Sequence, residues 1–441
     1  MRFAMLAAAL LLAAPPSTAP AALQQTQSGA AAGRIEPRIV VEQVRRVIAE
    51  RYVLPERRPA LDSILARGLA SGRYDVSEPG ALAERINADL ETAGRDRHLS
   101  FAYHPEHAAM LAAPAAGRTF DDAAFARQAR AANHGVAELR VLPGNIRYLA
   151  YEGFIWVDGE SAAALANAMR FLAGGDAVII DIRRNGGGSP QAVQYLVSHF
   201  LPADRPLVTF HMGGEPEPDR LSSLAELPAG RMIGKPLYVL TSGGTASAAE
   251  EFSGHVGGYR LGELVGETTA GAGFRNEMVA IEGGFVLSVS VGRAVLASTG
   301  RDWEAVGIAP TIRSEADQAL DVAHVHALRR LAAAASPEER PRLVAIAESV
   351  EARIAPRSPA LALAAYAGEY GERAVSLEEG RLYYRRGNRP KTALVPLGGH
   401  RFAFATDPAV VVDFAVEGSA AAALDIVEAG GASQGRYDRT R

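Results

Sequence analysis

The sequence predicts an α/β core with a helical region before it and a small antiparallel β region after it. Residues 136–292 alternate short apolar strands with helical runs, which is typical of α/β organisation with buried strands. Residues 35–95 place apolar side chains at the 3.6-residue period of amphipathic helices. Residues 358–432 carry aromatic side chains in short alternating segments with glycine turns, as antiparallel strands do.

The region before the core reads as a helical domain, which we place at residues 35–115. Its first run is IVVEQVRRVIAERY, and similar patterns recur at 58–72 and 79–93. One face of the first run collects its apolar side chains: Val40, Val44, Val47 and Ile48. A polar, small-residue linker at about 23–34 precedes these helices.

The core is expected over residues 118–330. It begins with a hairpin from Val136, in which Pro143 and Gly144 mark the turn. Further strands are expected at AVIIDI, near 206–210, at PLYVLTS, at 277–282 and at 285–292. A helix is expected from about 246. Residues 331–357 read as a helical linker, and the C-terminal β domain is expected at 358–432.

The composition excludes several kinds of partner and site. The chain has 441 residues, a formal net charge of -4 and no basic excess, so nucleic acid is not an expected partner. Outside the N-terminus no stretch of about 20 apolar residues occurs, so no membrane span is expected. The absence of cysteine removes disulfides, thiolate catalysis and a lipid-attachment site.

The first 22 residues have the pattern of a signal peptide. Arg2 supplies a positive charge, an apolar run covers Ala4 to Ala14, and Ala19-Pro-Ala21 offers small residues for cleavage. We therefore expect an exported protein, either periplasmic or secreted.

Three glycines, Gly186 to Gly188, directly follow the expected strand AVIIDI. Because glycine has no Cβ, their backbone N–H groups can approach a ligand closely and could hold a phosphate or an oxyanion. A dinucleotide-binding loop is excluded, since Gln191 stands where its last glycine belongs. A plain tight turn is the alternative.

Ser247 lies at the expected start of a helix, after the strand PLYVLTS and a glycine turn. The positive end of a helix dipole stabilises a developing alkoxide or oxyanion there. The segment is not the G-x-S-x-G elbow, because Thr245 occupies the first glycine position. Helix capping is the alternative role for an isolated serine at this position.

Two short segments could supply a base and its orienting acid: Asp96-Arg97-His98 and Asp302-Trp303-Glu304. A nucleophilic serine needs a base, usually a neutral imidazole, and a carboxylate such as that of Glu304 can fix the imidazole's tautomer. His104 and His107 lie close to His98 in the sequence, and His255 is too far along the helix from Ser247 to act as its base.

Four motifs occur in order: AVIIDIRRNGGG, LTSGGTASAAEEF, LVGETTAGAG and WEAVGIAP. Together they resemble the tail-specific, or C-terminal processing, serine peptidases over roughly residues 98–312. The resemblance implies a ClpP/crotonase-like spiral core. It also implies that Ser247 is the nucleophile and that the amides of Gly187 and Ala248 form the oxyanion hole, with Gly186 as an alternative to Gly187.

The resemblance also points to one branch of that family. The processing-peptidase branch has a lysine base in a G-K-G context, where this chain reads Gly271-Ala272-Gly273. The branch that resembles tricorn protease and the interphotoreceptor retinoid-binding proteins has, in its tricorn-like members, a His base with a Glu orienter, which would be His98 and Glu304. Only about 80 residues separate His98 from Asp181, so no PDZ domain is expected.

The expected activity is hydrolysis of a peptide or protein substrate through an acyl-enzyme, with a Ser-His-Glu triad. This chemistry needs no metal or organic cofactor. Two alternatives stay open: a non-catalytic binding protein for apolar ligands on the same fold, and a serine esterase. Glu250, one turn after Ser247, is expected to be a structural carboxylate rather than the third member of the triad.

Overall fold

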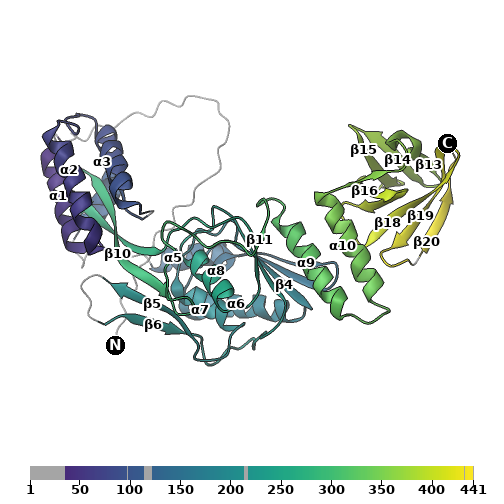
Figure 1. Cartoon of the computed structure of the whole chain (residues 1–441), viewed down its shortest axis with the longest axis horizontal. Coiled ribbons are helices and arrows are strands. Elements are labelled where there is room, and N and C mark those ends of the chain that lie inside the picture. The colour runs from purple at the N-terminus through teal and green to yellow at the C-terminus, as the bar shows by residue number, and fades with distance from the viewer. Residues whose placement is uncertain (1–34, 97, 114–121, 213–216, 432, 441) are drawn as a thin grey trace.

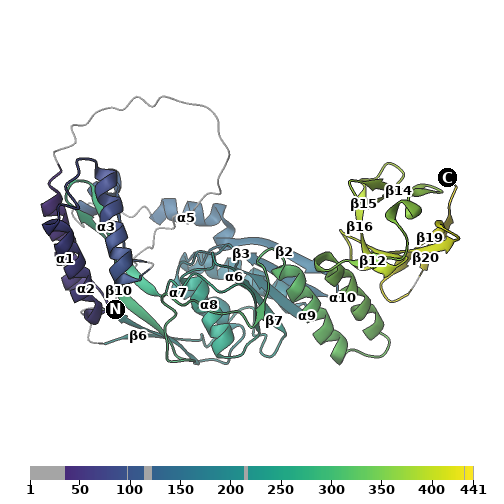
Figure 2. The ribbon, with the colours of Figure 1, turned by 45° about the horizontal axis from the view of Figure 1, so that its top comes forward.

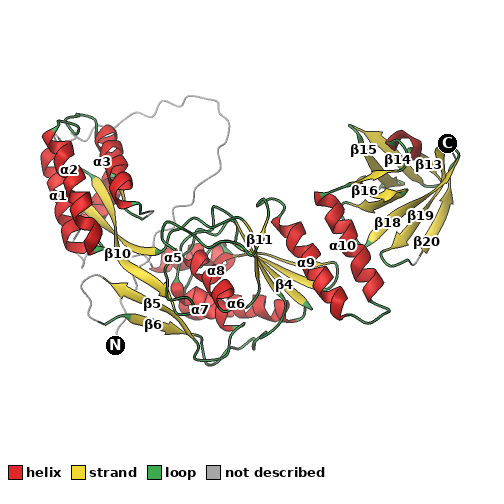
Figure 3. Ribbon diagram, viewed as in Figure 1, coloured by secondary structure: helices red, strands yellow, loops and turns green. Residues whose placement is uncertain are grey.

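The computed structural model describes residues 35–96, 98–113, 122–212, 217–431 and 433–440. The molecule is elongated, with three helices at one end, an α/β core in the middle and an antiparallel β region at the other end (Figures 1 and 3). The fold class predicted from the sequence is confirmed in these three parts. The predicted signal peptide, residues 1–22, lies outside the described residues, and the predicted domain boundaries stay a prediction.

The N-terminal helices pack on a sheet that extends from the core. Apolar faces of α1 (Pro37–Arg51), α2 (Arg58–Ala70) and α3 (Pro79–Gly94) share one buried cluster with the strand β10 (Phe285–Leu296). The short strand β1 (Ser100–Tyr103), which the sequence did not predict, pairs antiparallel with β10 and follows α3 directly. The sheet is completed by β5 (Pro206–Met212), β6 (Asp219–Ser222) and β9 (Phe274–Ile281).

The core sheet contains six strands in the order β11-β8-β7-β4-β3-β2. All neighbouring pairs are parallel except β2 with β3. Every residue of β4 and β7 is buried, as expected for parallel strands covered on both faces. The bounds are β2 Val136–Leu142, β3 Ile146–Tyr151, β4 Ala177–Asp181, β7 Leu237–Thr241, β8 Glu263–Gly266 and β11 Ile312–Arg313.

Helices cover both faces of this sheet. One face packs against α6 (Asp158–Ala173), α7 (Pro190–Ser198) and α8 (Ala248–Gly258), and the other against α9 (Ala319–Ala334) and α10 (Arg340–Ile354). Two more helices, α4 (Pro105–Ala112) and α5 (Asp122–Ala131), lie between β1 and β2 in the sequence. Because β4 and β7 are adjacent and parallel, the loops that follow them meet at one edge of the sheet, where α/β proteins usually bind ligands.

The C-terminal region is a nine-stranded, mainly antiparallel sheet around an aromatic cluster. Tyr366 contacts Phe402 and Phe414 with ring centroids 5.0 and 5.1 Å apart. The strands are β12 Arg357–Pro359, β13 Gly368–Tyr370, β14 Arg373–Glu378, β15 Arg381–Arg386, β16 Thr392–Gly399, β17 Arg401–Phe404, β18 Val410–Glu417, β19 Ala420–Glu428 and β20 Ser433–Asp438. Among the described residues, no helix combines the length and apolar character needed to cross a bilayer.

Candidate active site

Ser247 stands at the turn between β7 and α8 in a strained backbone conformation. Its φ is +54° and its ψ is −119°, a region that costs a residue with a side chain on the order of 1–3 kcal/mol. The turn is held against the end of β4: the hydroxyl of Thr245 donates to the carbonyl oxygen of Ile182 at 3.0 Å, and the N–H of Ala246 donates to that of Asn185 at 3.1 Å. The surrounding structure therefore imposes the conformation of Ser247, as it does at many functional sites.

The buried carboxylate of Glu250 holds the start of α8. One oxygen accepts the N–H of Ser247 at 2.9 Å and that of Ala272 at 2.7 Å. The other accepts the hydroxyl of Thr269 and the N–H of Gly271, both at 2.6 Å. Four donors at the positive end of a helix satisfy the oxygens of the Glu250 carboxylate, although Glu250 is fully buried. These contacts support the prediction that Glu250 is a structural carboxylate.

The glycine loop after β4 lies directly against Ser247. A Cβ added to Gly187 would stand 2.7 Å from the Cβ of Ser247 and 3.0 Å from the N of Ala248, so only glycine fits there. A Cβ added to Gly186 would face open space instead. The buried side chain of Asn185 fixes the loop, because its Nδ2 donates to the Tyr151 carbonyl and its Oδ1 accepts the N–H of Gly187, each at 2.9 Å.

Asn185 is a residue that the sequence analysis did not single out. Its position immediately before three glycines was the sequence feature that could have indicated a role in holding the loop. Its contact also bears on the proposed oxyanion hole: the N–H of Gly187 already donates to Asn185, so a substrate oxygen would have to share that donor or displace the amide.

His98 reaches the site from the turn between α3 and β1. Asp96 fixes this turn, since its Oδ1 accepts the N–H of His98 at 2.8 Å and that of Leu99 at 3.2 Å. The carbonyl of His98 accepts the hydroxyl of Ser288 on β10, and Asn276 on β9 donates to that hydroxyl at 2.7 Å. The pairing of β1 with β10 therefore brings the N-terminal region to the core.

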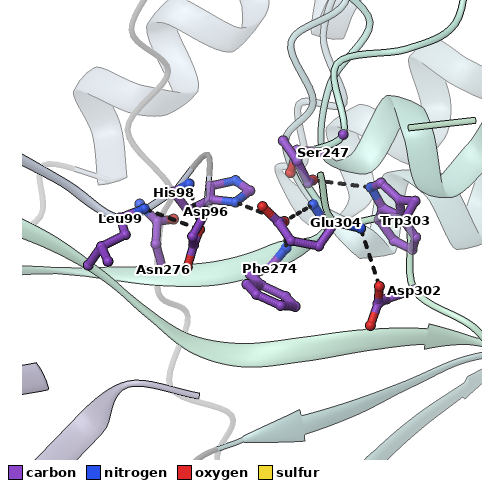
Figure 4. A network of polar contacts seen from close by, with 12 residues as sticks. Asp96, His98, Leu99, Ser247, Phe274, Asn276, Asp302, Trp303 and Glu304 are labelled. Atoms are coloured by element: carbon purple, nitrogen blue, oxygen red, sulfur yellow. Dashed lines mark hydrogen bonds and ion pairs between the residues drawn. The ribbon is translucent and has the colours of Figure 1, made fainter. Parts of the chain in front are cut away.

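Glu304 lies opposite the imidazole of His98. Its Oε2 accepts the N–H of Gly273 at 2.6 Å and that of Phe274 at 3.0 Å, and lies 3.9 Å from Nδ1 of His98. The neighbouring Trp303 is buried and donates from its indole to the carbonyl of Ala272 at 3.1 Å. Figure 4 shows His98 and Glu304 facing each other, and labels Ser247 in the same view.

Burial lowers the pKa of His98 below its ordinary value, and the charge of Asp96 opposes that shift. The imidazole is therefore neutral at neutral pH, which is the state that can accept a proton. Among the described residues, His98 Nδ1 has no hydrogen-bond partner, and no hydrogen bond joins Ser247 to His98. Hydrogen bonds of this kind are often long in unliganded sites and tighten around a substrate.

The other histidines that the sequence raised lie elsewhere. His104 is exposed and precedes α4, and His107 lies within that helix. His255 is buried inside α8, with its Nε2 3.4 Å from the carboxylate of Glu251. Within the described part of the chain, Asp96, His98 and Glu304 form a group whose potential ligand atoms lie within 4.8 Å of one another, a spacing that could also hold a metal ion.

Two family models match this chain in sequence order. Residues 145–314 match "Peptidase family S41", and residues 19–128 match "N-terminal domain of Peptidase_S41 in eukaryotic IRBP". Together the two matches cover more than half of the chain. The first contains Ser247 and Glu304, and the second contains His98.

Two curated relatives are carboxyl-terminal processing proteases. The chain is 27% identical to "Carboxy-terminal processing protease CtpB" of Bacillus subtilis, over 40% of this chain and 35% of the relative. It is 31% identical to "Carboxyl-terminal-processing protease" of Synechocystis sp., over 32% of this chain and 33% of the relative. The chain thus spans about a third of the length of the curated relatives it matches.

Several solved structures are distantly similar. The photosystem II D1 C-terminal processing protease aligns with a TM-score of 0.41 at 17% identity, covering 64% of this chain and 94% of that one. Mature CPAF aligns with a TM-score of 0.44 at 14% identity, covering 64% and 94%. These scores are low, so the assignment depends on the two family models and the curated relatives. On that basis the chain belongs to peptidase family S41.

Proposed function

We propose that this protein is a serine-type peptidase that hydrolyses peptide bonds through an acyl-enzyme on Ser247. The observation that carries the proposal is the strained backbone of Ser247 at the start of α8. The carboxylate of Glu250 joins Ser247 to Ala272, and the next residue, Gly273, binds the Glu304 carboxylate that faces His98. Strain at a serine in the turn between a strand and a helix is typical of an exposed nucleophile. Membership of family S41 supports the same class of chemistry.

In this mechanism the hydroxyl of Ser247 attacks the substrate carbonyl, and His98 accepts its proton. The Nδ1 of His98 faces Glu304, which leaves Nε2 to act as the base. The carboxylate of Glu304 selects the tautomer with a proton on Nδ1 and offsets the positive charge of the imidazolium. His98 then returns the proton to the leaving amine, and a water molecule hydrolyses the acyl-enzyme by the same route.

The oxyanion of the tetrahedral intermediate would lie between the glycine loop and α8. The N–H of Ala248, in the first turn of α8, adds the dipole of the helix to its hydrogen bond. The N–H of Gly187 is the second proposed donor, because the Gly187 backbone lies against Ser247. Gly186 stays the alternative second donor.

The names of the two curated relatives suggest a substrate class. Both are called carboxyl-terminal processing proteases, so we propose that this chain cleaves peptides or proteins near their carboxyl termini. We also propose that it acts after export, as the pattern of residues 1–22 predicts. Sequencing the N-terminus of the mature protein from the native host tests the export prediction.

Labelling with a fluorophosphonate tests the activated serine directly. We expect the wild-type protein to be labelled, Ser247→Ala to remain unlabelled, and Ser189→Ala to be labelled normally. Ser189 is a matched control because it also precedes a helix near the glycine loop. A folded wild-type protein that takes no label would contradict the proposal and favour a binding protein. Labelling combined with cleavage of esters but of no peptide in a mixed-sequence library would identify an esterase.

A further inference from the structure

The strand β2 forms an open edge of the core sheet. Among the described residues it pairs only with β3, and it is the last strand of the order β11-β8-β7-β4-β3-β2 (Figure 2). Its five central residues, Ala137 to Val141, are all exposed, and two of them are large apolar residues: Leu139 is 40% exposed and Val141 is 51% exposed. An exposed edge strand presents unpaired N–H and C=O groups that another strand can bind.

Other sheet edges of the described chain are less open to pairing. At the opposite edge of the core sheet β11 has only two residues. In the sheet that contains β10, the edge strand β6 has four residues, all polar or half-buried. In β9 only Arg275 is exposed. The edge strand β20 contains a glycine at position 435 and no apolar residue apart from Tyr437. Natural proteins keep such edges short, polar or covered. β2 has seven residues and exposes Leu139 and Val141 between and beside its two charged residues, which indicates a partner.

We propose that β2 pairs antiparallel with β2 of a second copy of this chain, so that the core sheet continues across a two-fold dimer. The charges of the strand are arranged for this partner. Glu138 and Arg140 flank Leu139 symmetrically, and a two-fold axis at Leu139 places each Glu138 opposite the partner's Arg140. Directly opposite residues share a face of the sheet, so two cross-strand ion pairs form at once.

In the isolated chain the same two side chains contact each other, and the guanidinium of Arg140 also lies over the ring of Tyr148, 4.9 Å from its centroid. Arg140 Nε lies 3.4 Å from the carboxylate of Glu138, and both side chains are nearly half exposed. The pairing of β2 with β3 is regular from Glu138 to Leu142, so the strand is extended where the ion pairs would form. The opposite face would bring Leu139 against the partner's Leu139 and Val141 near the partner's Ala137, which covers the exposed apolar side chains. Two-fold dimers are the commonest closed assemblies, and their interfaces are self-complementary in this way.

Cross-linking by a single introduced cysteine tests both the dimer and its register. The chain has no cysteine, so any disulfide in a single-cysteine variant joins two molecules. In the proposed register the two copies of residue 139 are directly opposite, with Cα atoms about 4.5–5.5 Å apart, within the range of a disulfide. We expect Leu139→Cys to form a covalent dimer rapidly under mild oxidation.

Val141→Cys is the matched control. In the same register the two copies of residue 141 are offset by four residues, about 13 Å along the strands, which is too far for a disulfide. We therefore expect Val141→Cys to cross-link far more slowly than Leu139→Cys, although residue 141 is the more exposed. Equal rates for the two variants, or no cross-link in Leu139→Cys, would overturn the proposal.

Charge reversal gives an independent test by sedimentation equilibrium. In Glu138→Arg and in Arg140→Glu, residues 138 and 140 carry the same charge, so like charges face each other in both cross-strand pairs. Each variant alone should therefore dimerise at least about tenfold more weakly than the wild type. An equimolar mixture of the two variants should recover association, because each strand then meets the opposite charge. The double variant Glu138→Arg/Arg140→Glu should dimerise as the wild type does. A wild type that stays monomeric, or single variants that dimerise normally while folded by circular dichroism, would refute pairing through β2.

Discussion

Two serines stand before neighbouring helices of the core, and their backbones differ. Ser189 precedes α7 in an extended conformation, with φ −84° and ψ 131°, and its hydroxyl accepts the N–H of Gln191 at 3.2 Å. Ser247 precedes α8 with φ +54° and ψ −119°, and its own N–H is bound by Glu250. The cap at Ser189 lowers the free energy of the fold. At Ser247 the capping box with Glu250 does the same, whereas the positive φ raises the free energy. A position before a helix therefore does not distinguish the two serines, but the backbone conformation does.

The largest expected effect follows from removing the hydroxyl at the strained position. Ser247→Ala should lower the turnover of a peptide substrate by about 10⁶-fold, because the serine and its base act as a unit. The fold should persist, since alanine keeps the backbone N–H that Glu250 binds. Steady-state kinetics with thermal unfolding as the stability control measures both. Turnover near the wild-type rate would reduce Ser247 to a second capping residue.

Removal of the base should cost nearly as much. His98→Ala leaves the hydroxyl of Ser247 without a proton acceptor, so we expect turnover to fall almost as far as in Ser247→Ala. His104→Ala and His107→Ala are the controls, and they should keep turnover within a few-fold of the wild type. A large loss in either control with full activity in His98→Ala would move the base to another histidine.

Glu304→Gln should lower turnover by about 10⁴-fold, as the loss of a triad carboxylate does. The amide oxygen can still accept the N–H groups of Gly273 and Phe274, so the loop should stay in place. The neutral amide cannot offset the charge of the imidazolium. Full activity in Glu304→Gln would remove Glu304 from the mechanism. Ala272→Lys, which introduces the lysine of the other branch, should not rescue His98→Ala, because residue 272 lies against the carboxylate of Glu250, and a negative charge raises the pKa of a lysine.

The three-part fold could be predicted from the sequence, and the candidate site residues could be named from it, because both depend on local patterns. Long buried strands, amphipathic helices and ordered glycine motifs are visible in a single chain. The four-residue strand β1 was not visible, since its strand character comes from pairing with β10, almost 190 residues later. That same pairing positions His98, so the sequence could name this residue but could not show what brings it to Glu304.

The strain at Ser247 was also beyond the sequence. The carboxylate of Glu250 holds the serine through donors at Thr269, Gly271 and Ala272, about twenty residues later. No local rule links these positions. The sequence could exclude a G-x-S-x-G elbow. It could not predict that Ser247 has a positive φ although the glycines of that motif are missing, with the carboxylate of Glu250 holding its N–H.

The pH dependence of activity tests the surroundings of the base. Because burial lowers the pKa of His98, kcat/KM should stay high as pH falls to the ordinary histidine range and should drop only below about pH 6.5. The charge of Asp96 raises this pKa, so Asp96→Asn should shift the acid limb to still lower pH. Asparagine keeps the Oδ1 that accepts the N–H of His98, so the turn is retained. A shift to higher pH would show that Asp96 acts on the turn rather than through its charge.

The smallest expected effect is at the ordinary cap. Ser189→Ala removes the acceptor for the N–H of Gln191, so the free energy of unfolding should fall by about 1 kcal/mol. Turnover should not change, because Ser189 holds the glycine loop through its backbone N–H, which donates to the carbonyl of Phe154 at 2.7 Å and is retained in alanine. Chemical denaturation and steady-state kinetics on the same preparation measure both quantities. We expect Ser189→Ala to lose stability and keep turnover, and Ser247→Ala to lose turnover and keep stability. The two measurements together would then distinguish the cap from the nucleophile. Loss of turnover in Ser189→Ala would instead mean that the hydroxyl of Ser189 acts on the glycine loop, and the contrast between the two helix starts would no longer hold.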